Sequence, residues 1–175
     1  MRLLIFINAI LLTSFTGSIS ASATIGEVTS HTGSTSISRS TEMLDMSDGL
    51  SVNLNDVAMT SNGRLAIQFI DEAQLRLTEH SKVLIDTIIY DPDPDKSKMV
   101  LKFAQGTARF ASGKLALINK ANIVIETPVA TIGIRGTDFT TTIDEIGRSL
   151  IILLPDENGD SSGEITVSNS AGTTI

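Results

Sequence analysis

Few side chains in this 175-residue chain could carry out catalysis. It has two histidines, His31 and His80, and no cysteine, so a thiol nucleophile and a thiolate-bound zinc are both excluded. Both histidines lie in polar stretches. Residues 159–163 match the letters G-x-S-x-G, but they belong to a polar acidic segment and not to the strand-to-helix turn that presents a hydrolase nucleophile. A carboxylate pair for glycoside cleavage lacks aromatic support, because the chain has no tryptophan and a single tyrosine, Tyr90. We therefore expect a protein that is not an enzyme.

Two acidic segments have carboxylates at the alternate spacing that a calcium ion can use. They are residues 91–95 (Asp-Pro-Asp-Pro-Asp) and 156–160 (Asp-Glu-Asn-Gly-Asp). Neither completes an EF-hand loop, since the sixth residue is Lys96 or Ser161 in place of glycine. We interpret both segments as solvated loops and expect no metal site and no cofactor. Weak structural calcium binding is the alternative.

A third group combines turn-forming residues with an arginine. It occupies residues 127–139 and includes Thr127, Pro128, Gly133, Arg135, Gly136, Thr137, Asp138 and Phe139. Pro128 fixes φ and lacks an amide donor, which predicts a strand start or edge. The two glycines predict backbone angles or close approaches that a side chain would block. Arg135 can pair with Asp138 or Glu126 and organise the turn, or it can face a ligand, and the sequence leaves both interpretations open.

Short runs of alternating apolar and polar residues surround these groups. Leu65, Ile67 and Phe69 share one face of such a run, which is typical of a half-buried strand. Turn signals such as Asn62-Gly63 separate the runs, because asparagine and glycine supply the positive φ of tight hairpins. No fixed-length repeat is present. The pattern predicts one all-β domain over residues 24–175, with many short antiparallel strands in an irregular β-solenoid or a sandwich-like arrangement.

The first 23 residues are typical of a secretory signal peptide. Arg2 precedes the apolar run 3–12, and Ala21-Ser22-Ala23 matches an A-x-A cleavage site. The apolar core is about half the roughly 20 residues that a membrane-spanning helix needs, so we expect cleavage after Ala23 rather than an uncleaved anchor. The expected product is exported, periplasmic or secreted, and has no stable membrane anchor.

The chain is acidic, with a formal net charge of −7 at pH 7. Removal of residues 1–23 makes the remainder more negative, because Arg2 is the only charged residue among them. An acidic surface repels a phosphate backbone, so we expect no nucleic-acid partner. The negative charge favours solubility instead.

Residues 127–139 (Thr-Pro-Val-Ala-Thr-Ile-Gly-Ile-Arg-Gly-Thr-Asp-Phe) resemble the most recognisable motif of FecR-like domains. In that family a T-P-x-A strand entry leads into an R-G-T-x-F turn. Upstream, residues 25–28 are similar to the family's opening strand, and Asp56 with Val57 and Thr60 is similar to its D-x-V-x-T step. Residues 64–77, which include Asp71, are similar to its next hairpin.

The resemblance implies the periplasmic part of a regulator of iron-siderophore uptake. In such a regulator a cytoplasmic tail controls an extracytoplasmic-function sigma factor, and one helix crosses the inner membrane. This chain has a signal peptide in place of that tail and helix, so the resemblance does not extend to direct control of a sigma factor. We expect an exported, non-enzymatic binding or signalling module with a protein partner in the cell envelope. The alternative is a structural or surface-associated envelope domain.

The C-terminal residues predict an incompletely paired strand. Residues 164–168 alternate, with Ile165 and Val167 on the apolar face, and a turn then leads to a run of only three residues, 173–175. A strand with so short a neighbour keeps unpaired amides and carbonyls. We therefore predict that this edge binds a partner strand or a second copy of the chain.

Overall fold

The computed structural model describes residues 23–91, 93, 95–118, 122–135, 138–155, 159, 163–169 and 171–175. All of the predicted signal peptide except residue 23 is thus outside the described residues. In chain order the elements are β1 (Thr24–Arg39), β2 (Glu42–Leu44), β3 (Ser51–Asn53), β4 (Val57–Phe69), β5 (Gln74–Leu77), β6 (Lys82–Ile89), β7 (Lys98–Ala111), α1 (Leu115–Ile118), β8 (Ile123–Glu126), β9 (Ala130–Arg135), β10 (Phe139–Ile143), β11 (Ser149–Leu153) and β12 (Glu164–Asn169).

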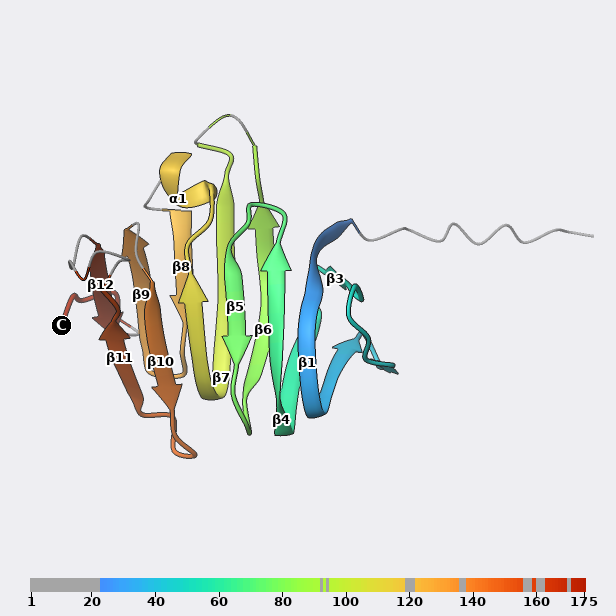
Figure 1. Cartoon of the computed structure of the whole chain (residues 1–175). Coiled ribbons are helices and arrows are strands. Elements are labelled where there is room, and N and C mark those ends of the chain that lie inside the picture. Colours follow the sequence, from blue (N-terminus) through green and yellow to red (C-terminus); the bar gives the residue numbers. More distant parts are fainter. Residues whose placement is uncertain are drawn as a thin grey trace, which may run out of the picture.

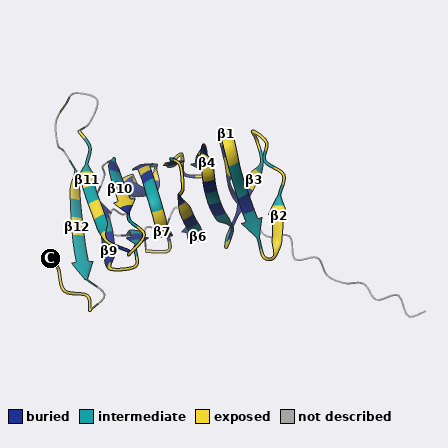
Figure 2. Cartoon of the chain, turned by 90° about the horizontal axis from the view of Figure 1, so that it is seen from below, coloured by how far each residue is buried: buried dark blue, intermediate teal, exposed yellow. Residues whose placement is uncertain are grey.

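The described strands join one hydrogen-bonded sheet that folds over into two layers (Figures 1 and 2). Layer A has the order β11–β10–β7–β5–β4–β1–β3. Layer B has the order β12–β9–β8–β7–β6–β4–β1–β2. Strands β1, β4 and β7 contribute to both layers and, at 16, 13 and 14 residues, are longer than the short strands predicted. The all-β prediction is confirmed, and the layers correspond to its sandwich-like alternative.

The long strands bend where the sheet passes from one layer to the other. Strand β7 pairs with β6 up to Gln105 and with β10 from Gly106 onward. The register between β1 and β4 also shifts, between Gly33 and Thr35, and such irregularities bend a strand. Gly106 has φ +90°, and a Cβ atom there would lie 2.4 Å from the Cα atom of Ser81. The bend in β7 therefore requires glycine at this position.

The two layers enclose an apolar core. Phe110 and Phe139 contact each other with ring centroids 5.8 Å apart and ring planes at 42°. Leu65, Ile67 and Phe69 are all buried, which confirms the strand face predicted for them. Fully buried side chains come from both layers and include Ile37, Leu75, Leu77, Ile85, Met99, Leu101, Ile123 and Ile125. Burial of this apolar surface is the main force that holds the layers together.

One strand pairing departs from the predicted antiparallel arrangement. Strands β7 and β8 are parallel, with Met99 opposite Ile123. The chain leaves the end of β7 in layer A and enters β8 in layer B, and parallel neighbours need a crossover connection of this kind. Helix α1 is part of the connection and lies at one end of the two layers (Figure 1). Its Leu115 is fully buried, so the crossover also closes that end of the core.

Strands β11 and β12 form the last strands of layers A and B (Figure 1). Among the described residues, β11 pairs only with β10, and its Leu150 and Ile152 are 60% and 48% exposed. The outer edge of β12 is partly covered by the C-terminal residues, because the Ile175 amide donates to the carbonyl of Val167 at 2.9 Å. The strand predicted at 164–168 is confirmed. Binding of another chain at its edge stays a prediction.

Candidate functional site

The first half of the 127–139 segment is a turn that connects β8 with β9. The Thr127 amide donates to the Ala130 carbonyl at 2.8 Å, and the Ala130 amide donates to the Thr127 hydroxyl at 3.0 Å. Pro128 is the second residue of this four-residue turn, where its fixed φ is favourable. The Thr127 hydroxyl also lies 3.0 Å from that of Ser149 in β11. Thr127 therefore links a turn of layer B to layer A, which is a structural role.

Gly133 does not need to be glycine for the predicted reason. It lies within β9, opposite Val124 of β8 and Thr166 of β12. Its φ is not in the left-handed region, and a Cβ atom would meet nothing nearer than Thr166 at 3.9 Å, which is an ordinary contact. The predicted backbone requirement is therefore wrong for Gly133. Gly136 and Thr137 lie outside the described residues.

The second half of the segment contributes a buried ring and a carboxylate. Phe139 is fully buried, whereas Asp138 accepts a hydrogen bond from Arg109 at 3.2 Å. Glu126 lies 3.6 Å from the ammonium group of Lys102. The backbone of Arg135 pairs with β12, but its side chain is outside the described structure. The predicted pairing of Arg135 with Asp138 or Glu126, and its alternative of a ligand contact, stay predictions.

The family-like aspartates upstream are buried at the two ends of β4. Asp56 precedes the strand, and its carboxylate receives two hydrogen bonds from Arg39, at 2.9 and 2.8 Å. The hydrogen bond to Asp56 raises the pKa of the Arg39 guanidinium. Asp71 follows the strand and accepts from the amides of Ala73 and Leu115, at 3.1 and 3.4 Å. Burial raises the pKa of the Asp71 carboxyl group. Both carboxylates accept hydrogen bonds from backbone amides and so stabilise turns at the ends of the strand.

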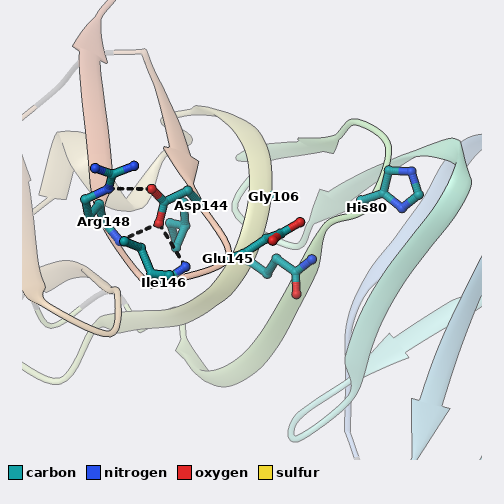
Figure 3. Close-up of a pocket in the computed structure, with 8 residues that line it drawn as sticks. His80, Gly106, Asp144, Glu145, Ile146 and Arg148 are labelled. Carbon is teal, nitrogen blue, oxygen red and sulfur yellow. Dashed lines mark hydrogen bonds and ion pairs between the residues drawn. The ribbon is translucent and has the colours of Figure 1, made fainter.

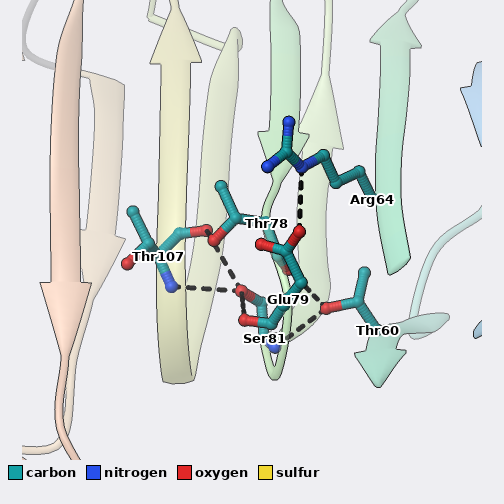
Figure 4. A network of polar contacts seen from close by, with 6 residues as sticks. All are labelled: Thr60, Arg64, Thr78, Glu79, Ser81 and Thr107. Atoms are coloured by element: carbon teal, nitrogen blue, oxygen red, sulfur yellow. Dashed lines mark hydrogen bonds and ion pairs between the residues drawn. The ribbon is translucent and has the colours of Figure 1, made fainter. Parts of the chain in front are cut away.

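Thr60, also in the family-like segment, belongs to a network of hydrogen bonds at the bend (Figure 4). Its hydroxyl donates to the Thr78 carbonyl at 2.5 Å and accepts from the Ser81 amide at 2.9 Å. The Ser81 hydroxyl in turn donates to the Thr107 carbonyl and accepts from the Thr107 amide, each at 3.1 Å. The network joins β4, the β5–β6 turn and β7. Because satisfied buried networks fix local geometry, this threonine too has a structural role.

A shallow groove with a volume of about 610 Å³ crosses the outer face of layer A. It extends over β1, β4, β5, β7 and β10. Hydroxyl groups and guanidinium groups dominate its polar lining, which includes Thr32, Arg64, Arg76, Thr78, Thr107 and Arg109. The three arginines are exposed. A protein with a net charge of −7 thus presents three guanidinium groups on one face, two of them paired with carboxylates.

The arginines of this groove come from three neighbouring strands. Arg76 of β5 lies directly opposite Arg109 of β7 in the sheet register. Arg76 donates to the Gln74 side chain at 3.1 Å, while Arg109 pairs with Asp138 and Arg64 with Glu79. Sequence reasoning missed this group. The alternation of each strand predicts that its arginine faces outward, but only the strand order brings the three together.

A second cleft, of about 640 Å³, lies beside the bend (Figure 3). On one side is the β10–β11 turn, where Asp144 pairs with the Arg148 guanidinium at 2.6 Å and accepts from the amides of Ile146 and Arg148. The Arg148 side chain lowers the pKa of Asp144. His80 lines the other side. The carboxylate is held by its own turn, so this cleft is a weaker candidate than the groove.

The first acidic segment uses its carboxylates locally. The Asp93 amide donates to the Asp91 carboxylate at 2.8 Å, and Asp93 pairs with Lys96 at 3.0 Å. Within the part of the chain that the structure describes, no group of three histidine, aspartate or glutamate residues could hold a metal ion. Most of the second acidic segment lies outside the described residues. None of the helices in the described residues has the length and apolar character needed to cross a bilayer.

Comparison with known proteins agrees with the resemblance noted in residues 127–139. No curated protein and no solved structure matches the chain. The family profile described as "FecR protein" matches residues 55–154, more than half of the 175 residues. The match begins at the turn that holds Asp56 and ends just after β11. The chain therefore belongs to the FecR family.

Proposed function

We propose that this protein is an exported, non-enzymatic binding or signalling module, similar to the periplasmic domain of FecR-type regulators. Its partner is a protein of the cell envelope. The observation that supports this most directly is the groove on layer A, which exposes three arginines on an acidic protein. The family-like residues Asp56, Thr60 and Asp71 are buried in turns and at the bend. The groove, in contrast, is exposed and can be reached by a partner.

Export is supported by the N-terminal sequence, with Arg2, the apolar run 3–12 and the small residues before Thr24. The test is expression of the full chain in bacteria, followed by intact-mass measurement of each cell fraction. We expect the exported protein to begin at Thr24. A control variant with Ala21→Phe and Ala23→Phe should keep its leader, because the signal peptidase accepts only small side chains there. A membrane-bound wild-type protein that retains Met1 would contradict export with cleavage.

Recognition of an envelope protein is tested by placing a photoreactive amino acid in the groove. Ala66 lines the groove, whereas Lys98 is exposed on layer B. After irradiation of cells, a cross-linked envelope protein should appear with the probe at Ala66 and be absent with the probe at Lys98. Identical products at both positions, or no product at either, would argue against a binding module that works through this face.

A second candidate function, assembly within the envelope, is favoured by the open edge of β11. Leu150 and Ile152 are 60% and 48% exposed on a strand that, within the described residues, pairs with β10 alone, and exposed apolar edges pair with other chains. Analytical ultracentrifugation over a range of concentrations tests it. Self-association that Ile152→Lys abolishes would support assembly, and a monomer at all concentrations would exclude it.

A further inference from the structure

The arginine groove has an arrangement that the fold itself does not explain. The residue opposite Arg76 on one side is Ala66, the residue opposite it on the other side is Arg109, and the next in that row is Thr140. The two guanidinium groups are thus flanked along the row by short side chains. Arg64 lies on the strand next to Arg76, one row away. The short side chains leave the space of the groove open, and the arginines supply its positively charged groups.

Like charges directly opposite each other on adjacent strands destabilise a sheet. Arg109 is partly compensated by Asp138 at 3.2 Å, whereas Arg76 donates to the neutral side chain of Gln74. Among the described residues, no carboxylate lies within ion-pair distance of Arg76. An anion that entered the groove would reach both guanidinium groups and relieve their repulsion. The cost of the Arg76–Arg109 pair to the fold therefore points to a ligand.

We propose that this groove binds an extended acidic segment of a polypeptide. The assignment rests on the proposed function and names the chemistry of the partner. Carboxylates suit guanidinium groups because they accept two parallel hydrogen bonds. The hydroxyls of Thr78, Thr107 and Thr140 in the lining can bond to peptide groups. No phenylalanine, tyrosine or tryptophan is among the lining residues, so the groove lacks the usual stacking platform for a sugar.

The spacing of the arginines sets the pattern of the partner. Opposite side chains on adjacent strands begin about 5 Å apart, so a single carboxylate can contact both Arg76 and Arg109. In an extended segment, residues two apart project to the same side about 7 Å from each other. A second carboxylate two positions along then lies near Arg64. The groove is thus expected to select acidic residues at alternate positions.

The experiment measures binding of a fluorescently labelled peptide in which glutamate alternates with serine. Titration uses anisotropy at low and at physiological ionic strength. The groove variant carries Arg76→Gln and Arg109→Gln, and the matched control carries Lys82→Gln and Lys98→Gln, which remove equal charge from exposed positions of β6 and β7 in layer B. We expect Kd to rise at least about tenfold in the groove variant, since charge-assisted pairs are the strong ones. The control should stay within about twofold, because charges beyond a Debye length are screened.

Thermal unfolding gives a second readout that needs no ligand. If the fold tolerates the arginine pair at a cost, the groove variant should have a Tm equal to or above that of the wild type. A lower Tm would show that the arginines stabilise the sheet, and the inference would be dropped. The same holds if the wild type does not bind the peptide or if the two variants lose affinity equally.

Two further outcomes separate this inference from the proposed function. Polygalacturonate is the comparison ligand, and groove-dependent binding to it that is tighter than to the peptide would overturn the assignment to a polypeptide. An envelope protein that still cross-links at Ala66 in the Arg76→Gln, Arg109→Gln variant would leave the proposed function intact and exclude an acidic contact. Peptide binding without any cross-linked envelope protein would support the acidic contact and contradict the proposed function.

Discussion

Strand β4 lies between two buried aspartates whose surroundings differ. Asp56, before the strand, faces the guanidinium group of Arg39 at the end of β1, and the Asn53 amide donates to it at 2.9 Å. Asp71, after the strand, accepts hydrogen bonds from backbone amides, and no cation within the described residues lies at ion-pair distance from it. The first carboxylate is paired with a cation, whereas burial raises the pKa of the second. Two buried aspartates of one chain are thus accommodated in different ways, one by a cation and the other by backbone amides.

The largest loss of stability is expected when the cation that compensates Asp56 is removed. Arg39→Ala removes the cation that pairs with the fully buried Asp56. We expect the free energy of unfolding to fall by about 3 kcal/mol or more, because an uncompensated buried charge is costly. Urea unfolding measures it. The control is Arg64→Ala, which breaks the exposed pair with Glu79 and should have a far smaller effect.

The same comparison can be made within the pair. If the loss in Arg39→Ala comes from the stranded carboxylate, the double variant Arg39→Ala, Asp56→Ala should be more stable than Arg39→Ala alone. If the double variant is only as stable as Arg39→Ala, or less stable, the loss in Arg39→Ala comes from the missing packing of the arginine side chain and not from its missing charge.

A smaller effect is expected from the backbone around Asp71. A Cβ atom on Gly113 would lie 2.3 Å from the Asp71 carbonyl oxygen and 2.3 Å from the Ala73 amide nitrogen. Gly113→Ala should therefore destabilise the protein by about 1–3 kcal/mol, the usual range for overpacking. Gly133→Ala is the matched control and should stay within about 0.5 kcal/mol, since nothing lies within 3.9 Å of its added methyl group. Equal melting temperatures for the two variants would contradict the close approach at Gly113.

Much of the fold could be predicted because alternation is a local signal. The buried face of Leu65, Ile67 and Phe69 follows from the period of two alone. The passage of β4 between layers could not be predicted in this way, because it depends on pairing with β6 at Val57 and with β5 at Leu65. The parallel pairing of β7 with β8 is equally non-local. Neither feature can be recognised from the residue pattern of one strand alone.

In the candidate site, too, local features could be predicted from the sequence and features that depend on strand pairing could not. The described part of segment 127–139 contains a turn, a strand and a buried ring, so Thr127, Pro128 and Phe139 reflect local geometry. Arg76 and Arg109 are 33 positions apart in the numbering and belong to no conspicuous motif. Their juxtaposition arises from the register of β5 with β7. The motif therefore indicated the family, whereas the surface proposed for binding could be found only from the strand order.

The smallest effect at neutral pH, and the one with the clearest pH dependence, is expected for Asp71→Asn. The amide oxygen of asparagine can still accept from Ala73, and only the longer bond from Leu115, at 3.4 Å, is lost. The free energy of unfolding at pH 7 should therefore change by about 1 kcal/mol or less. The pKa of Asp71 is raised by burial above its ordinary value of 3.8. Its contribution to stability is therefore complete below pH 3.8 and is lost as the pH rises through the folded-state pKa.

Asparagine does not ionise, so the variant escapes this loss. The stability of Asp71→Asn relative to the wild type should accordingly increase as the pH is raised from about 4 to 7, because the unfolded wild type releases its proton before the folded one does. Urea unfolding of both proteins at matched ionic strength measures the difference and cancels the groups that they share. Asp56→Asn is the control, since removal of its charge breaks the pair with Arg39. It should be less stable than the wild type at pH 7 by a wide margin. If Asp71→Asn instead loses ground to the wild type as the pH rises, the Asp71 carboxylate is stabilised by its turn, and the contrast between the two ends of β4 disappears.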